Sequence, residues 1–344
     1  MGFRGEYAPA HAATPIERPD SPALHRLLKG GLAVAGSWAA QNIESIATVA
    51  EYELYLHTDP VFRDFIYPPD ITSLLTSQQP TRYDLDSILK TRIITFGDSL
   101  VVGRVDGGID YPSAWHIARK MNQYVHKNNW IWQNEAWNGA NTADVRKQIA
   151  KTTLKDSVTI DTDIIISVGS NDLLQEPNLL SQLDALRQNP TNISALRTFT
   201  HDFDAYLHIY RQNIQSILQD ILLFAEEKDA RVNRVLAYGS PNTENAKHLE
   251  LPHGEILPMI GATKEFTARC SSLINLSMAK TVLEIGKHMP FDVRFIHNAT
   301  LRTEDFSGMH PNEQGYIKMA ENQMRQSTVS LPTYEGTSLY DLAA

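Results

Sequence analysis

The amino-acid sequence predicts an α/β protein of three layers, in which helices cover both faces of a central parallel sheet of about five strands. Between residues 92 and 326, short β-branched runs alternate with longer segments whose apolar residues recur at helical spacing. The run after Asp163 is almost continuously apolar (IIISV), which is typical of a strand buried on both faces of a sheet. Because ligands of such sheets bind at the carboxyl ends of the strands, we expect the functional site at that edge.

Short segments rich in β-branched and aromatic residues are expected to form the strands. They are residues 92–96, 130–132, 163–168, 234–238 and 291–296. Helices are expected where apolar residues return every three or four positions, and proline is favoured in the first turn of a helix. The expected helices follow Pro112, cover about 197–226 and 262–287, and begin again after Pro311.

The first quarter of the chain differs in composition from the rest. Four prolines stand among few apolar residues up to about position 25, whereas about 23–57 is rich in Ala, Leu, Ile and Glu. We therefore expect residues 1–90 to form a mostly helical extension, residues 91–330 the α/β domain and residues 331–344 a C-terminal tail. The extension carries no chemical motif, so we expect it to pack on the α/β body and shape the entrance of a pocket, or to mediate oligomerisation.

Composition excludes several classes of protein. The 344 residues include 31 Lys and Arg against 40 Asp and Glu, and a net charge of −9 repels a phosphate backbone, so no nucleic-acid partner is expected. The single cysteine, Cys270, excludes an internal disulfide and any Cys-rich metal motif. The run Gly30–Ala40 is well short of the ~20 apolar residues of a spanning helix, so no transmembrane segment is expected. A cytoplasmic location and secretion after removal of an export signal both stay open.

Four loops at the carboxyl ends of the expected strands carry the polar residues of an acyl-transfer site. Ser99 directly follows a strand and a glycine, a position that presents its hydroxyl above the sheet edge. Gly139 offers an unobstructed backbone N–H beside a helix start, and Asn171 follows the most apolar strand. His310 stands before the proline that opens the last helix. Together these residues supply a nucleophile, donors to an oxyanion and a general base.

These segments, in this order, resemble the SGNH, or GDSL-type, serine hydrolases (esterases and lipases) over about residues 92–326. The motif Gly97–Leu100 (GDSL) matches the first block of that family, and the segment Asn134–Val145 matches the second. The third block matches Gly169–Asp172, and the fifth matches His310–Pro311. The resemblance implies an SGNH hydrolase-like, flavodoxin-like fold for the α/β domain.

The resemblance also implies a role for each site residue. Ser99 would be the nucleophile, and its own N–H would be one oxyanion donor. The Gly139 N–H and the Asn171 side chain would be the second and third donors, and His310 would be the general base. This chemistry needs no metal and no cofactor, and the sequence has no His-Glu-x-x-His motif.

The family's aspartate normally lies three residues before the histidine, and Ser307 takes that position here. Two acceptors for the Nδ1–H of His310 are therefore open. One is the carboxylate of Asp305, which a bulge at Ser307-Gly308 would bring to the ring. The other is the backbone carbonyl of Ser307, which would leave a Ser–His dyad. We slightly favour Asp305 as the third catalytic residue, because a charge stabilises imidazolium better than a neutral acceptor does.

The sequence thus predicts a serine ester hydrolase that cleaves a carboxylic ester of a small molecule, a lipid or an acetylated sugar. Two alternatives stay open. One is an acyltransferase with the same chemistry, and the other is a binding or assembly protein that keeps the fold without turnover. The sequence does not specify the oligomeric state.

Overall fold

A computed structural model describes the following parts of the chain: residues 48–76, 78, 81–82, 91–105, 108–109, 111–124, 130–154, 160–189, 191–241, 243–250, 256–258, 261–298, 301–326 and 329–330. Most of the expected extension and the whole expected tail of residues 331–344 lie outside them. The chain divides into two compact units, residues 1–51 and residues 52–344, and the fold below is that of the second unit.

Five parallel strands form the central sheet: β2 (Thr91–Gly97), β5 (Trp130–Asn134), β6 (Asp161–Ser167), β7 (Val232–Tyr238) and β10 (Asp292–Ile296). They lie in the order β10-β7-β6-β2-β5, which is the flavodoxin-like order, and the predicted α/β class is confirmed. The direction of winding reverses between β2 and β6. Open α/β sheets bind their ligands at the carboxyl ends of the strands beside such a reversal.

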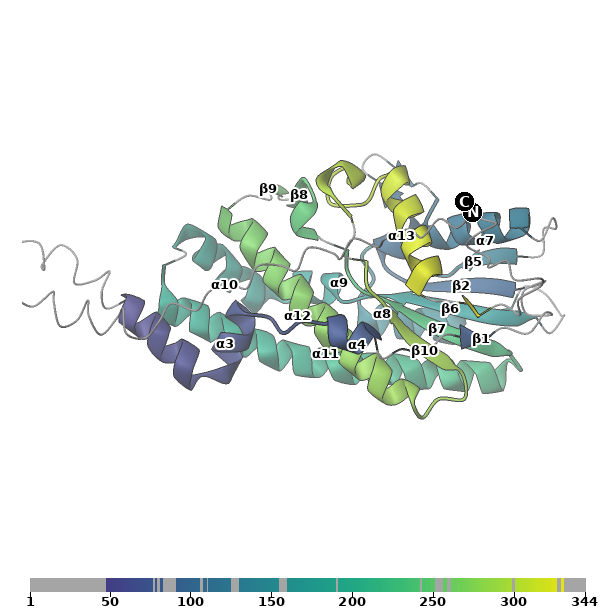
Figure 1. Cartoon of the computed structure of the whole chain (residues 1–344), viewed down its shortest axis with the longest axis horizontal. Helices are drawn as coiled ribbons and strands as arrows, with labels where there is room; N and C mark the ends of the chain where they lie inside the picture. Colours follow the sequence, from purple (N-terminus) through teal and green to yellow (C-terminus); the bar gives the residue numbers. More distant parts are fainter. Residues whose placement is uncertain are drawn as a thin grey trace, which may run out of the picture. The chain divides into compact units, whose positions relative to one another are not determined.

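Helices cover both faces of the sheet (Figure 1). One face is covered by α7 (Ser113–Tyr124) and α13 (Glu313–Gln326), and the other by α8 (Thr142–Lys151), α11 (Ile193–Glu227) and α12 (Gly261–Gly286). Successive strand residues point to opposite faces, so neighbours along a strand belong to different cores. In β6, Ile165 packs in the core under α7 and α13, whereas Ile164 and Ile166 pack in the core under α11 and α12.

Shorter elements connect these layers. The helices among them are α3 (Pro60–Ile66), α4 (Thr72–Thr76), α6 (Ser99–Val102), α9 (Ser170–Leu174), α10 (Pro177–Gln188) and the 3-10 turns η2 (Thr243–Asn245) and η3 (Thr303–Asp305). The strand pairs among them are β1 (Thr81–Arg82) with β11 (Val329–Ser330), β3 (Arg104–Val105) with β4 (Gly108–Ile109), and β8 (His248–Glu250) with β9 (Ile256–Pro258).

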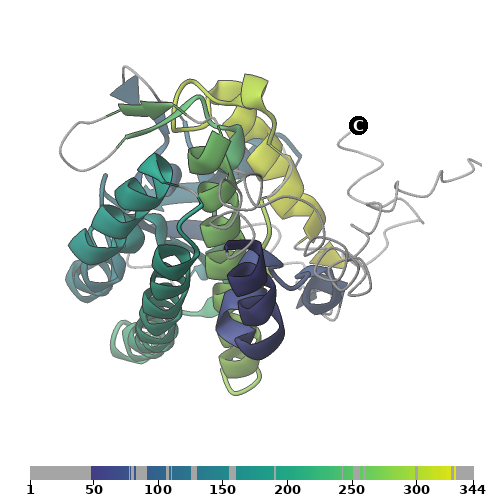
Figure 2. The ribbon, with the colours of Figure 1, turned by 90° about the vertical axis from the view of Figure 1, so that its left-hand side faces the viewer.

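The N-terminal halves of α11 and α12 extend past the carboxyl edge of the sheet. The 35 residues of α11 span about 52 Å, more than twice the roughly 23 Å of a seven-residue strand. Tyr206 and Tyr210 mark the crossing, because their hydroxyls donate to the backbone oxygens of Gly169 and Val168, just beyond the end of β6 (both 3.0 Å). Figure 2 shows α12 beside α10 and α11 in this overhanging part.

The helix α3 packs against the overhanging ends of α11 and α12. The ring centroid of Phe65 lies 5.5 Å from that of Phe199 and 6.3 Å from that of Phe266. Asp59 caps α3 and accepts hydrogen bonds from Arg197 and His201 of α11 (2.8 and 2.7 Å). Burial alone would raise the pKa of Asp59, but these bonds and the one from its own helix lower it to about 2.

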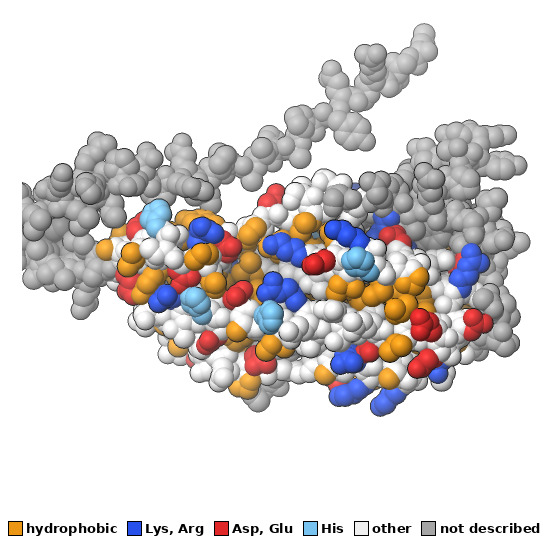
Figure 3. Space-filling model, turned by 90° about the horizontal axis from the view of Figure 1, so that it is seen from below, with side chains coloured by type: hydrophobic (Ala, Val, Ile, Leu, Met, Phe, Trp, Pro, Cys, Tyr) orange, Lys and Arg blue, Asp and Glu red, His pale blue; other side chains and the backbone are white. Residues whose placement is uncertain are grey.

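The outer surface of the helical layer carries charges of both signs. On the face shown in Figure 3, Lys and Arg side chains are mixed with Asp and Glu side chains, and apolar side chains gather right of its centre. Two large apolar residues of α11, Ile209 and Leu223, are exposed.

The end of β2 requires a glycine. Gly97 has a φ of 139°, and a Cβ at this position would overlap the carbonyl oxygen of Ser167 in the neighbouring strand. Neither the conformation nor the contact tolerates a side chain.

We therefore expect Gly97→Ala to lower the free energy of unfolding by at least ~3 kcal/mol, because it combines backbone strain with a clash against a buried strand. Gly108→Ala is the matched control, since a Cβ there has no atom within 4 Å. Urea unfolding of the two variants measures the difference. Equal stability of the two variants would contradict this account of the turn.

Candidate active site

The turn after β2 places Ser99 at the carboxyl edge of the sheet. Asp98 caps the short helix α6, and its Oδ1 accepts from the backbone N–H of Leu100 (3.1 Å) and from the hydroxyl of Ser167 (3.2 Å). The Asp98 N–H donates to the carbonyl of Ser167 (3.1 Å), so both sides of the turn are tied to β6. Ser99 is therefore held in a fixed place at the start of α6.

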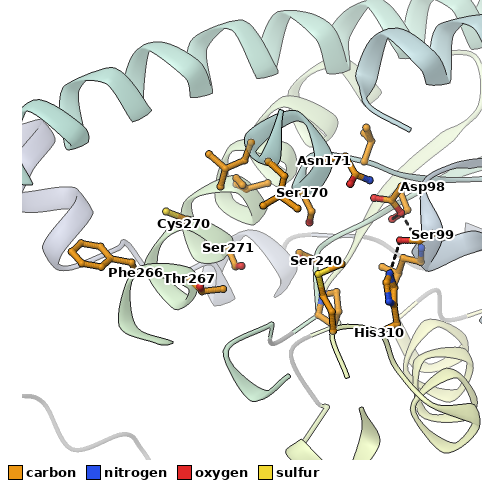
Figure 4. A pocket seen from close by; sticks show the side chains of 18 of the residues that line it. Asp98, Ser99, Ser170, Asn171, Ser240, Phe266, Thr267, Cys270, Ser271 and His310 are labelled. Carbon is orange, nitrogen blue, oxygen red and sulfur yellow. Dashed lines mark hydrogen bonds between the residues drawn. The ribbon is translucent and has the colours of Figure 1, made fainter. Parts of the chain in front are cut away.

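His310 reaches Ser99 from the other end of the sequence. Its Nε2 lies 2.9 Å from the Oγ of Ser99, although 211 positions separate the two residues (Figure 4). The loop before α13 holds the ring, because Phe306 and Pro311 form an antiparallel bridge and the Ser307 N–H donates to the carbonyl of His310 (3.0 Å). The side chain pair has the geometry in which a histidine can take a proton from a serine hydroxyl.

Asn171 lies beside this pair, and Gly139 lies in the adjoining loop. Ser99, Asn171 and His310 line one cavity, and Asn171 donates through Nδ2 to the carbonyl of Ala140 (3.2 Å). Gly139 has a φ of 74° with open space around it, and its carbonyl accepts from Gln175 (3.0 Å). The structure thus brings three of the five expected residues, Ser99, Asn171 and His310, into one cavity. Gly139 lies one residue from a contact of Asn171, and Asp305 is not among the residues that line this cavity.

The Gly139 loop is held by the half-buried carboxylate of Asp172. Asp172 accepts from the backbone N–H of Thr142 (3.0 Å) and from its hydroxyl (2.6 Å), which fixes the start of α8 against α9. Burial raises the pKa of Asp172, and its hydrogen bonds with Thr142 act in the opposite direction. This contact joins the loop that carries Gly139 to the helix that carries Asn171.

Asp305 is buried, and each of its two carboxylate oxygens accepts a hydrogen bond from a group other than the His310 ring. Oδ1 accepts from Nζ of Lys318 in α13 (2.6 Å), and Oδ2 accepts from the backbone N–H of Arg302 (2.9 Å). These bonds tie η3 to α13 and so fix the ends of the loop that carries His310. This arrangement differs from the one expected for a carboxylate dedicated to His310, because the charge of Asp305 is already balanced by an ammonium group.

Two residues that hold the turn after β2, Gln148 and Asp98, were not identified from the sequence as parts of the site. Gln148 of α8 is buried, and its side-chain amide binds the N–H and the carbonyl of Gly97 (2.7 and 2.9 Å). Its only signal is position, since it shares the apolar stripe of α8 with Val145 and Ile149. Asp98 gave no separate signal, because a residue of a Gly-Asp-Ser turn can simply cap a helix.

The cavity beside Ser99 is mostly apolar. Besides the residues of the turn and the histidine loop, side chains of α9, α10, α11 and α12 line it. Cys270 is one of them, and burial raises the pKa of its thiol to about 12, so the thiol is neutral at ordinary pH. The apolar members contributed by the helices are Leu173, Leu174, Leu179, Leu180, Leu183, Phe199, Phe266 and Ile274.

The chain belongs to the family of GDSL-like lipases and acylhydrolases, whose family model matches residues 93–322. Membership of this family supports ester hydrolysis as the general activity of the protein. No curated protein sequence matches the chain.

Solved structures of low sequence identity are similar to this chain. A lipase from a goat rumen metagenome is 17% identical, over 70% of this chain and 99% of the lipase, with a TM-score of 0.43. A catalytic mutant of an acetylxylan esterase from Geobacillus stearothermophilus is 12% identical, over 70% and 95%, with a TM-score of 0.42. A lipase/acylhydrolase from Enterococcus faecalis is 14% identical, over 69% and 94%, with a TM-score of 0.37.

Neither a membrane-spanning helix nor a metal-binding cluster is found in the part of the chain that the structure describes. Among the described helices, none combines the length and the hydropathy that a bilayer crossing needs. Within the same residues, no three His, Cys, Asp or Glu side chains gather closely enough to hold a metal ion.

Asp98 has an unusual protonation equilibrium for a carboxyl group beside a candidate nucleophile. Burial raises its pKa from 3.8 to about 7, against the opposing effect of the hydrogen bonds from Leu100 and Ser167. Both of those bonds reach Oδ1, so Oδ2 is the oxygen suited to carry the proton. The folded state therefore binds this proton more tightly than the unfolded state does.

Because the pKa is raised on folding, the stability that Asp98 contributes is complete below about pH 4 and is lost as the pH rises through about 7. Asp98→Asn keeps the acceptor oxygen and cannot ionise. Between pH 4 and pH 7.5, the free energy of unfolding of the wild type should fall relative to the variant by an amount on the order of 2–4 kcal/mol. Urea unfolding of both proteins across this range measures it, and parallel pH profiles would contradict the buried neutral carboxyl.

Proposed function

We propose that the protein is a serine ester hydrolase in which Ser99 is the nucleophile and His310 is the general base. The backbone N–H of Ser99, the backbone N–H of Gly139 and the side-chain amide of Asn171 are the donors to the oxyanion in this proposal. The observation that carries it is the 2.9 Å contact between Ser99 Oγ and His310 Nε2. The contact lies in a cavity at the carboxyl edge of the sheet, on a chain of the GDSL-like family.

In the proposed mechanism, His310 Nε2 accepts the hydroxyl proton while Ser99 Oγ bonds to the carbonyl carbon of the ester. The negative charge that develops on the carbonyl oxygen is stabilised by the three donors. The tetrahedral intermediate collapses, and the protonated His310 returns the proton to the leaving alcohol. Water then attacks the acyl-enzyme, with His310 again as the base, and releases the carboxylic acid and free Ser99.

We assign Asp305 to the support of the histidine loop in place of the direct orientation of the ring. Its hydrogen bonds to Lys318 and to the Arg302 N–H support this assignment, because they hold both sides of the loop. The competing assignment is a triad in which Asp305 accepts a hydrogen bond from His310 Nδ1. In a triad the negative charge of Asp305 stabilises the imidazolium, so replacement of Asp305 by Asn would remove that stabilisation.

Ser99→Ala should abolish ester hydrolysis, because loss of a triad serine in a comparable enzyme costs roughly 10⁶ in kcat. Hydrolysis of p-nitrophenyl esters and labelling by a fluorophosphonate both test this. Ser170→Ala, which removes a second hydroxyl from the same cavity, is the control and should keep most of the activity. The assignment of the nucleophile is wrong if Ser99→Ala retains more than about a tenth of the wild-type kcat.

Asp305→Asn should lower kcat less than about tenfold, whereas an orienting triad aspartate would cost about 10⁴. Lys318→Met should have a similar effect, since it breaks the same tie between η3 and α13. The pH dependence of kcat separates the two roles, because loss of a charge beside the imidazolium shifts the profile and a loosened loop does not. A large fall in Asp305→Asn with a normal Lys318→Met enzyme would establish the triad instead.

A further inference from the structure

We propose that the cavity beside Ser99 is a channel for one unbranched acyl chain of about ten carbons, and that Phe199 and Phe266 form its end wall. The proposal rests on the proposed function, since Ser99 defines the end at which the ester lies. It goes further by naming the substrate class, which is the esters of medium-chain fatty acids. Esters of acetate or of a sugar-bound acetyl group would fill only the first part of such a channel.

Two helices supply most of the channel walls. Leucines of α10 (Leu179, Leu180 and Leu183) line it together with residues of α12 that recur at helical spacing, namely Phe266, Cys270 and Ile274. The spacing of four residues keeps those three side chains on one face of α12. Figure 4 shows Phe266 and Cys270 at the opposite end of the cavity from the pair of Ser99 and His310.

The chemistry of the walls favours a hydrocarbon. Asp98 and His310 are the titratable side chains among the lining residues apart from the Cys270 thiol, and both lie at the Ser99 end. Farther along, α12 contributes two hydroxyl groups, those of Thr267 and Ser271, and the Thr267 hydroxyl donates to the carbonyl of Thr263 in its own helix (2.7 Å). A sugar would need convergent polar partners in this part of the cavity, whereas an alkyl chain gains free energy simply by leaving water.

The end wall is rigid because a third ring packs behind it. The centroids of Phe199 and Phe266 lie 6.2 Å apart, and Phe65 of α3 lies 5.5 and 6.3 Å from them. Phe65 and Phe199 are almost completely buried, and Phe266 is 5% exposed. The described part of the expected extension therefore braces the far end of the cavity, and Phe65 acts as a positioning residue for the end wall.

The length of the channel follows from helix geometry. From Ile274 to Phe266, α12 advances eight residues, or about 12 Å. Three bonds of an extended chain cover about 3.6 Å, so about ten bonds fit along this wall. Each methylene that enters should raise kcat/KM about fourfold, which is the conversion of ~0.8 kcal/mol per buried methylene. Beyond about ten carbons the chain meets the end wall, and the increase should stop.

The experiment is a series of p-nitrophenyl esters from C2 to C16, at concentrations below micelle formation. The wild type should show kcat/KM rising steeply to an optimum between about C8 and C12 and falling beyond it. Thr267→Trp narrows the far half of the channel and should lower the C10/C4 ratio of kcat/KM at least tenfold. Glu265→Trp places the same ring on the exposed side of α12 and is the matched control, with an unchanged ratio.

Phe266→Ala should move the optimum to longer chains, provided that the variant folds. Thr267→Trp deletes no core contact, so it keeps the proposal testable if Phe266→Ala does not fold. A flat or C2-favouring profile of the wild type, or an unchanged C10/C4 ratio in Thr267→Trp, would overturn the channel.

A binding readout separates this proposal from the proposed function. Decanoate should raise the melting temperature of Ser99→Ala, because a ligand that binds only the folded state stabilises it. It should have at least tenfold lower affinity for the double variant Ser99→Ala with Thr267→Trp. If decanoate binds in this pattern while the wild type hydrolyses no ester, the chemistry is wrong and the channel stands. If the wild type hydrolyses esters but decanoate does not bind in this way, the chemistry stands and the channel is wrong.

Discussion

Gly97 ends β2 with its backbone against Ser167 of β6, so close that no other residue fits there. The side chain of Gln148 hydrogen-bonds to both the N–H and the carbonyl of Gly97. The next residue, Asp98, hydrogen-bonds to Ser167 of β6 through its N–H and its carboxyl group. Buried backbone groups must be hydrogen-bonded, and a chain that turns sharply at a sheet edge loses its strand partners. The amide of Gln148 and the N–H of Trp137 supply partners to the polar groups of Gly97. The position of Ser99 therefore depends on contacts from α8 and β6 as well as on its own short helix.

The same edge collects groups from distant parts of the sequence because parallel strands end together. β2 brings Ser99, the segment after β6 brings Asn171, and the loop after β5 brings Gly139. His310 does not follow a strand directly, and it is delivered by a loop whose two ends are fastened to each other and to α13. A site made in this way needs its loops fixed by polar contacts, such as those of Asp172 with Thr142 and of Asp305 with the Arg302 N–H.

The sequence alone predicted the sheet and the local turns well, because both follow from short-range patterns. Each of the five strands lies where a β-branched run was found, and the helices predicted over about 197–226 and 262–287 are α11 and α12. The partner of Asp305 was not predictable in this way. Sequence spacing pointed to His310, five residues away, as the partner of Asp305. The actual partner, Lys318, lies in α13, and the direction of its side chain depends on how α13 packs against α7. Gln148 was missed for a related reason, since periodicity says that a position is buried and not what it binds.

The overhang of α11 and α12 is the part of the fold in which stability and specificity depend on the same side chains. A helix that extends past its sheet must bury its apolar stripe against something else, and here α3 and α10 supply that surface. Together with α9 and the turn that carries Ser99, the helices α10, α11 and α12 leave a cavity between them. The remaining cavity is apolar because its walls are the inner faces of those helices. A substitution among the apolar residues of α12 that face the cavity therefore changes two things at once, the packing of the overhanging helices and the shape of the cavity. Any gain in cavity volume is accompanied by a loss of buried contacts.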